Sequence, residues 1–121
     1  MTLPLNPETI AALYEYARSL PPFSALKKMP HADDVEFRVV KDRTRFGWYQ
    51  RVRGRHRISV SIVACGHTTT LVNTIGHEMI HLYLSEAGLE SGGNENVHNS
   101  AFRKLAARFC KIHGVDPKAF F

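Results

Sequence analysis

Residues 77–81 of this chain, with the sequence HEMIH, guide the interpretation of everything around them. If the segment is helical, His77 and His81 lie one turn apart on the same face, so their imidazoles can converge on one ion. Glu78 is then placed to accept a proton from a water bound to that ion. The pattern H-E-x-x-H on a helix is typical of zinc hydrolases that use a glutamate base.

Apolar residues surround this motif on nearly all sides: Leu71, Val72, Ile75, Met79, Ile80, Leu82 and Leu84. A helix that is apolar all round is expected to be buried. Two histidines and a glutamate on a buried helix need polar partners or a metal ion, because an unpaired buried polar group is costly. We therefore predict a helix over residues 68–87, ended by Gly88, that binds Zn²⁺ through His77 and His81.

One zinc ligand remains to be found, because a catalytic zinc ion usually has three protein ligands and an open position for water. We predict that His98 is this ligand, since it follows a loop over residues 89–96 and can fold back toward the ion. Carboxylates are the alternatives, because some H-E-x-x-H enzymes use a glutamate here. Glu86 and Glu90 are too near the motif helix to reach round it, and Glu95 lies within the loop.

Three runs of alternating apolar and polar residues predict a small sheet. They cover residues 35–40, 43–53 and 56–64. Gly54 predicts a tight turn between the last two runs, which then form an antiparallel hairpin. In the hairpin we expect Phe46 and Trp48 to face the core, His56 to lie in the turn, and the last strand to offer a sheet edge beside the metal site.

Helix signals flank these strands. A capping asparagine, a proline and a glutamate over residues 6–8 predict a first helix that ends before Pro21. A stripe of apolar residues predicts a last helix over residues 99–113. The predicted fold is therefore α+β, with an N-terminal helix, a three-stranded antiparallel sheet, the HExxH helix and a C-terminal helix. We expect a single domain over residues 1–121.

Composition is that of an ordinary globular protein, with 44% hydrophobic and 22% charged residues. No apolar stretch is long enough for a membrane span, so no membrane association is expected. Residues 1–5 lack the pattern of a secretory signal, and Cys65 and Cys110 are too few for a disulfide framework. We expect a monomer in the cytoplasm.

Basic residues are unevenly placed along the chain. The net charge is +5, and eight of the sixteen Lys and Arg lie between residues 38 and 57. Asp42 is the one acidic residue in that stretch. The predicted hairpin carries six arginines: Arg43, Arg45, Arg51, Arg53, Arg55 and Arg57. Because arginine binds phosphate through a fork of donors, DNA is a candidate partner and the nucleoid a candidate location. The alternative is a solvated sheet face.

Residues 74–82 (TIGHEMIHL) and 95–103 (ENVHNSAFR) resemble the SprT-like zinc metallopeptidases, a family that includes the Spartan proteases acting on proteins crosslinked to DNA. The family pattern has a third histidine followed shortly by an aromatic residue, here His98 and Phe102. The resemblance implies a minimal zincin-like fold, a Zn²⁺ cofactor, and protein or peptide substrates. The paired cysteines of the zinc ribbon that many members carry are not found in these 121 residues.

The predicted chemistry is peptide hydrolysis at a zinc ion held by His77, His81 and His98, with Glu78 as general base. Two other functions remain open. The first is a nucleic-acid-binding module whose zinc is structural, with little or no peptidase activity; a fourth protein ligand would favour it, because structural sites are closed. The second is a metal hydrolase acting on something other than peptides.

Overall fold

The computed structural model describes residues 5–62, 68–89 and 98–120. Its elements follow the order α1 (Pro7–Arg18), η1 (Phe23–Ala25), η2 (Ala32–Asp34), β1 (Val35–Val40), β2 (Gly47–Val52), β3 (Arg55–Ser61), α2 (Thr68–Ala87), α3 (Ser100–His113) and α4 (Pro117–Phe120). This order confirms the predicted α+β class. The short helix α4 was not predicted.

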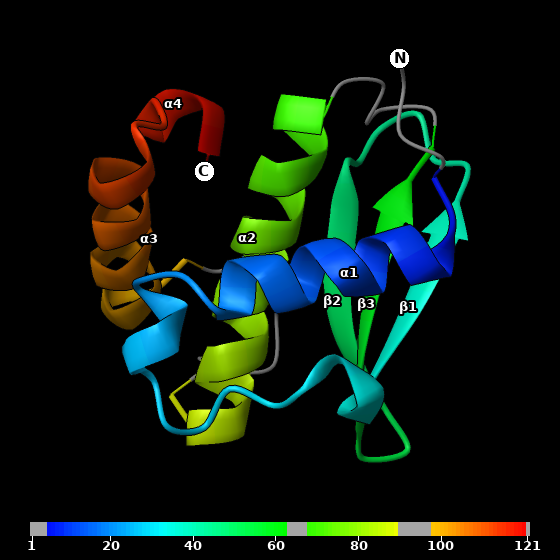
Figure 1. Ribbon diagram of the computed structural model, residues 1–121, viewed down its shortest axis with the longest axis horizontal. Helices are drawn as coiled ribbons and strands as arrows, with labels where there is room; N and C mark the ends of the chain where they lie inside the picture. The colour runs from blue at the N-terminus through cyan, green and yellow to red at the C-terminus, as the bar shows by residue number, and fades with distance from the viewer. Residues whose placement is uncertain (1–4, 63–67, 90–97, 121) are drawn as a thin grey trace.

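The central element of the fold is α2 (Figure 1). It stands between the sheet and α3, while α1 crosses in front of α2 and the sheet (Figure 1). The buried residues of α2 include Ile75, Met79, Ile80 and Leu82, all at most 1% exposed. The apolar character on all sides of α2 is thus explained, because other elements cover it from several directions.

The sheet has the strand order β1-β3-β2, and β1 pairs with β3 in parallel, so the prediction of a fully antiparallel sheet is wrong. The predicted hairpin of β2 and β3 is present and antiparallel. The segment between β1 and β2 crosses over the end of β3. There Ser61 N donates to Phe46 O at 2.8 Å, and Ile62 N donates to Val40 O at 2.8 Å. The central strand β3 therefore has one parallel neighbour, β1, and one antiparallel neighbour, β2.

The prediction that Phe46 and Trp48 face the core is also wrong. Tyr49 is 6% exposed, whereas Phe46 is 57% exposed. The register places Tyr49 opposite Ile58, a fully buried residue, and Trp48 opposite Ser59 on the other face. Side chains alternate along a strand, so the choice of Tyr49 as the inward residue turns Trp48 outward.

Local capping sets the helix ends that matter for the site. Asn99 Oδ1 accepts from Phe102 N at 2.9 Å, which begins α3. Gly88, directly after α2, and Gly114, directly after α3, both have left-handed φ values, of 72° and 67°. These two glycines confirm the predicted C-terminal ends of the two helices.

Within the described ranges, none of the helices is long and apolar enough to cross a membrane.

Candidate metal centre

The motif helix brings its two histidines together as the spacing predicted. The rings of His77 and His81 lie one helical turn apart, with centroids 5.1 Å from each other. His81 is 1% exposed and Glu78 is 5% exposed. The three side chains are therefore held in a largely buried part of a helix whose other faces are packed.

The structure brings His98 to the same place from the start of the next helix. Its ring centroid lies 5.0 Å from that of His77 and 5.3 Å from that of His81. The backbone around His98 is held by two side chains: Arg103 Nη1 donates to His98 O at 2.8 Å, and Asn99 Nδ2 donates to Leu89 O at 2.9 Å. The second bond ties the start of α3 to the end of α2.

The three histidines fit a metal ion by size and by donor type. One ligand atom from each residue can be chosen so that all three lie within 4.8 Å of one another. Two nitrogens bound to one zinc ion, each at about 2.0–2.1 Å, are at most about 4.2 Å apart. The cluster is only slightly wider than this limit. Over the described residues it contains three ligands, which is the number found in catalytic rather than structural zinc sites.

Phe102 packs against all three imidazoles. It is fully buried, and its ring lies parallel to that of His98 at 4.1 Å, with an interplanar angle of 8°. Its centroid is 5.0 Å from that of His77 and 4.6 Å from that of His81. The aromatic residue expected one turn after the third histidine thus fixes the orientation of the rings.

Burial favours the neutral form of two of these imidazoles, those of His77 and His98. Burial lowers the pKa of His77 from 6.5 to about 4, although the hydrogen bond with the Phe120 carbonyl acts in the opposite direction. Burial also lowers the pKa of His98. A metal ion binds the neutral form of histidine, so ligand nitrogens that stay deprotonated at neutral pH suit a metal site.

A pocket of about 630 Å³ opens onto the cluster. Glu78 lines it together with the three histidines, so the carboxylate and the proposed ligands share one cavity. The other walls come from three regions: residues 44–47 before and at the start of β2, Thr70, Asn73 and Thr74 of α2, and Lys118 and Phe120 of α4. Sequence reasoning missed the first and last of these walls, because neither carries a recognisable motif.

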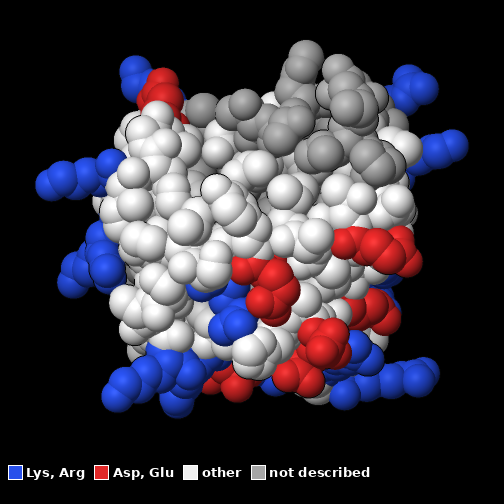
Figure 2. Space-filling view, in the orientation of Figure 1, with Lys and Arg blue, Asp and Glu red and all other residues white. Residues whose placement is uncertain are grey.

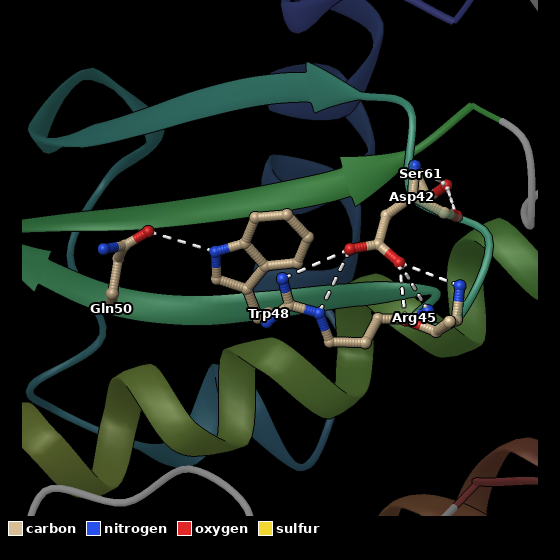
Figure 3. Close-up of polar contacts among 6 residues, drawn as sticks. Asp42, Arg45, Trp48, Gln50 and Ser61 are labelled. Carbon is tan, nitrogen blue, oxygen red and sulfur yellow. Dashed lines mark hydrogen bonds and ion pairs between the residues drawn. The ribbon is translucent and has the colours of Figure 1, made fainter.

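The loop before β2 is ordered by Asp42 (Figure 3). Asp42 Oδ1 accepts from Thr44 N at 2.8 Å and from Arg45 N at 3.0 Å, and the Thr44 backbone bond is the main reason that the pKa of Asp42 falls to about 2. The Arg45 guanidinium pairs with Asp42 at 3.2 Å and lies 3.8 Å from the centroid of the Trp48 ring. This network holds one wall of the pocket in a fixed shape.

The strand next to the pocket is β2 rather than β3. Because β3 is the central strand, the expectation that it forms an edge beside the site is wrong. Gly47, at the start of β2, lines the pocket. A Cβ atom at this position would lie 2.6 Å from Ser59 O and 2.9 Å from Thr74 Cγ2, so a side chain there would push β2 away from α2.

Half of the six arginines of the hairpin region are engaged by acidic side chains. Three of them pair with carboxylates: Arg45 with Asp42, Arg51 with Glu86, and Arg57 with Glu36. On the face seen in Figure 2, most Lys and Arg side chains project at the outline of the molecule, others lie nearer the middle beside acidic side chains, and they do not gather in one patch. Contact with nucleic acid therefore stays a prediction.

A second hollow, of about 490 Å³, lies at the turn between β2 and β3. Three arginines line it, Arg53, Arg55 and Arg57, together with Glu36, Val52 and His56. Arg53 has a left-handed φ of 54°, and Gly54 follows with a φ of 79°. Two successive positive φ values are those of a type I′ hairpin turn, in which asparagine or glycine is the usual first residue.

His56 was expected in the hairpin turn, but it is a buried residue of β3, 6% exposed. Its Nδ1 lies 2.6 Å from the Tyr49 hydroxyl and its Nε2 lies 2.8 Å from Glu86 Oε2. The hydrogen bond with His56 is the largest cause that lowers the pKa of Glu86. Glu86 is thus engaged away from the metal cluster, while its rivals Glu90 and Glu95 lie outside the described residues.

The geometry defines a class of protein: an α+β domain whose H-E-x-x-H helix is completed by a histidine at the start of the following helix. A sequence model of the SprT-like family matches residues 22–119, and the chain belongs to that family. The matched range contains the three histidines and Glu78 and ends one residue before Phe120. Comparison with curated proteins gave no match.

Proposed function

We propose that this protein is a zinc-dependent peptidase. The observation that carries the proposal is the shared cavity, in which three histidines of suitable spacing face a pocket that a buried glutamate also lines. Membership of the SprT-like family, whose members are typically zinc metallopeptidases, supports the same conclusion. A closed structural zinc site is less well supported, since the cluster has three ligands within the described part of the chain.

In this proposal His77, His81 and His98 hold the zinc ion. When bound, the ion supplies polarisation of the substrate carbonyl and activation of a water molecule. Glu78 is the general base that takes the proton of that water and then delivers it to the departing amine. The position of Glu78 favours this role, because its side chain lines the same cavity as the three histidines.

We further propose that the substrate is an extended peptide segment lying along the edge of β2. This strand is at one side of the sheet and borders the pocket at Gly47. An extended chain can add to such an edge through backbone hydrogen bonds, as in other cases of strand addition.

The decisive test is Glu78→Gln in zinc-loaded protein. Loss of general base catalysis typically costs about 10²- to 10⁴-fold in rate. We expect that loss in the cleavage of an unfolded protein substrate, with zinc content unchanged by metal analysis. The matched control is Glu8→Gln, at an exposed glutamate of α1, which should retain full activity. Equal rates for Glu78→Gln and wild type would refute the assignment.

The hollow at the β2–β3 turn favours a nucleic acid partner for the same protein. Three arginines converge there, and Arg53 keeps a conformation that costs a non-glycine residue about 1–2 kcal/mol. Strain of this kind is typically retained where a side chain has a function. We therefore propose that the hollow binds a phosphate group of DNA.

The salt dependence of DNA binding tests this second proposal. Removal of one phosphate contact by Arg53→Ala should weaken binding and reduce the slope of log K against log salt by about 0.9. Arg18→Ala is the control, because Arg18 lies on α1 and pairs with Glu15. If the two variants lose equal affinity, the hollow is not the site. Binding of DNA by a zinc-loaded protein that cleaves nothing would instead support the binding-module alternative.

A further inference from the structure

The short helix α4 follows α3 and turns the chain back toward α2 (Figure 1). At its last residue, the backbone oxygen of Phe120 lies 2.8 Å from Nδ1 of His77, across 43 positions of sequence. A carbonyl oxygen can only accept a hydrogen bond, so Nδ1 of His77 must carry the proton. In a neutral imidazole this leaves Nε2 as the nitrogen with a lone pair.

Packing holds the Phe120 carbonyl in place. The Phe120 side chain is 3% exposed, and its ring stacks on Phe109 of α3 with centroids 4.7 Å apart. Phe109 in turn sits against Gly76 of α2, where an added Cβ would lie 2.7 Å from Phe109 Cζ. Gly76, the residue before His77, is therefore in contact with the Phe109 ring on which the Phe120 ring stacks. This chain of contacts links α2, α3 and α4 directly behind the cluster.

We propose that Phe120 is a positioning residue of the metal site: its carbonyl selects the Nδ1–H form of His77 and directs Nε2 toward the metal. The inference rests on the proposed zinc site. Histidine ligands commonly donate their second ring N–H to a carbonyl or carboxylate, which fixes the tautomer and the ring orientation. Here that partner comes from the backbone of a four-residue helix, so the side chain of Phe120 acts only by anchoring it.

A purely structural role for Phe120 predicts something different. If the ring serves only to fill the core, the His77 tautomer is independent of residue 120. Lys118 provides a matched control, because it lies on the same helix and lines the same pocket, and its side chain is exposed. A change at Lys118 alters α4 without removing the anchor on Phe109.

The first measurement uses the unaltered protein. Nitrogen-15 NMR of the histidine side chains, in zinc-free and zinc-loaded samples at neutral pH, should show His77 protonated at Nδ1 in both and zinc bound at Nε2. A proton on Nε2 in the zinc-free protein, or zinc on Nδ1, would overturn the proposal. This result does not depend on whether any variant folds.

The second measurement is zinc affinity by competition with a chelator. Phe120→Ala should weaken binding about 10- to 100-fold and mix the two His77 tautomers, whereas Phe120→Leu should restore most of the affinity and Lys118→Ala should match wild type. Wild-type affinity in Phe120→Ala overturns the proposal. These outcomes can be distinguished from those of the peptidase test. If zinc binds at Nε2 but the protein cleaves no substrate, this inference holds and the proposed function is wrong. If the protein cleaves its substrate but His77 has the other tautomer, the proposed function holds and this inference is wrong.

Discussion

Two regions along α2 each hold a histidine among polar groups, with different consequences; His56 belongs to the neighbouring strand β3 and is buried, and His77 belongs to α2 and is partly buried. Near the C-terminal end, His56 has one ring nitrogen against the Tyr49 hydroxyl and the other against Glu86. Closer to the middle, His77 uses Nδ1 for the Phe120 carbonyl, and its ring neighbours are two more histidines. We call the first group the His56 lock and the second the metal cluster. The comparison teaches that burial alone does not make a histidine a metal ligand; the groups facing each nitrogen decide it.

Electrostatics separates the two groups as well. In the His56 lock a carboxylate faces the imidazole, and the hydrogen bond lowers the pKa of Glu86. In the metal cluster burial is the largest influence and lowers the pKa of His77 to about 4. The lock therefore carries its own counter-charge, whereas in the cluster burial opposes protonation of His77 and His98 and keeps their nitrogens available for a cation.

The largest expected effect comes from His98→Ala. Removal of a ligand should lower zinc affinity by more than the roughly 10- to 100-fold that is typical of an outer partner. Chelator competition and metal analysis measure this. His31→Ala is the control, because its side chain is 70% exposed and it pairs with Glu15. If His98→Ala keeps the affinity of the wild type, the cluster is not a three-histidine site.

The next effect concerns the His56 lock. His56→Leu removes the ring nitrogen that pairs with the buried Tyr49 hydroxyl, and loss of one partner of a buried polar group costs about 1–3 kcal/mol. We expect urea denaturation to show that decrease in the free energy of unfolding, with zinc affinity unchanged. The double variant with Tyr49→Phe should recover much of the loss, since both partners are then apolar. A loss of zinc affinity in His56→Leu would abolish the distinction between the two groups.

Local sequence information was sufficient for the metal cluster. A spacing of four residues places His77 and His81 together in any helix, and the apolar residues around them determine that the helix is buried. The start of α3 is likewise local, because Asn99 caps the helix that His98 precedes. For these reasons the helix bounds and the three clustered histidines could be predicted without knowledge of the fold.

Other features depend on distant contacts and could not be predicted in this way. The alternation along β1 is the same whether its neighbour is parallel or antiparallel. Counting apolar residues on β2 favoured Trp48 as the inward residue, whereas Tyr49 faces inward because His56 satisfies its hydroxyl. The bond from His77 to Phe120 uses a backbone oxygen, which leaves no signature in the sequence.

A third effect, no larger than that of His56→Leu, is the pH dependence of the free energy of unfolding of the zinc-free protein. The pKa of His77 falls from 6.5 to about 4 on folding, so between these values the unfolded chain binds more protons. Stability is then fully present above pH 6.5 and decreases as the pH falls toward 4. From pH 7 to pH 5 the loss is about 2 kcal/mol for this group. Urea denaturation at several pH values measures it, and His77→Asn should remove the part of the dependence that comes from this group and leave the part that comes from His98.

The smallest effect is expected at Arg51, which reaches Glu86 at 3.2 Å from outside the His56 lock. Both side chains are about 40% exposed, at 41% and 39%, and such pairs contribute about 0.2–1 kcal/mol. Arg51→Met should therefore lower the free energy of unfolding by less than about 1 kcal/mol, and the difference should shrink at high salt. A loss as large as that of His56→Leu would mean that the exposed ion pair, and not the buried imidazole, joins the sheet to the end of α2.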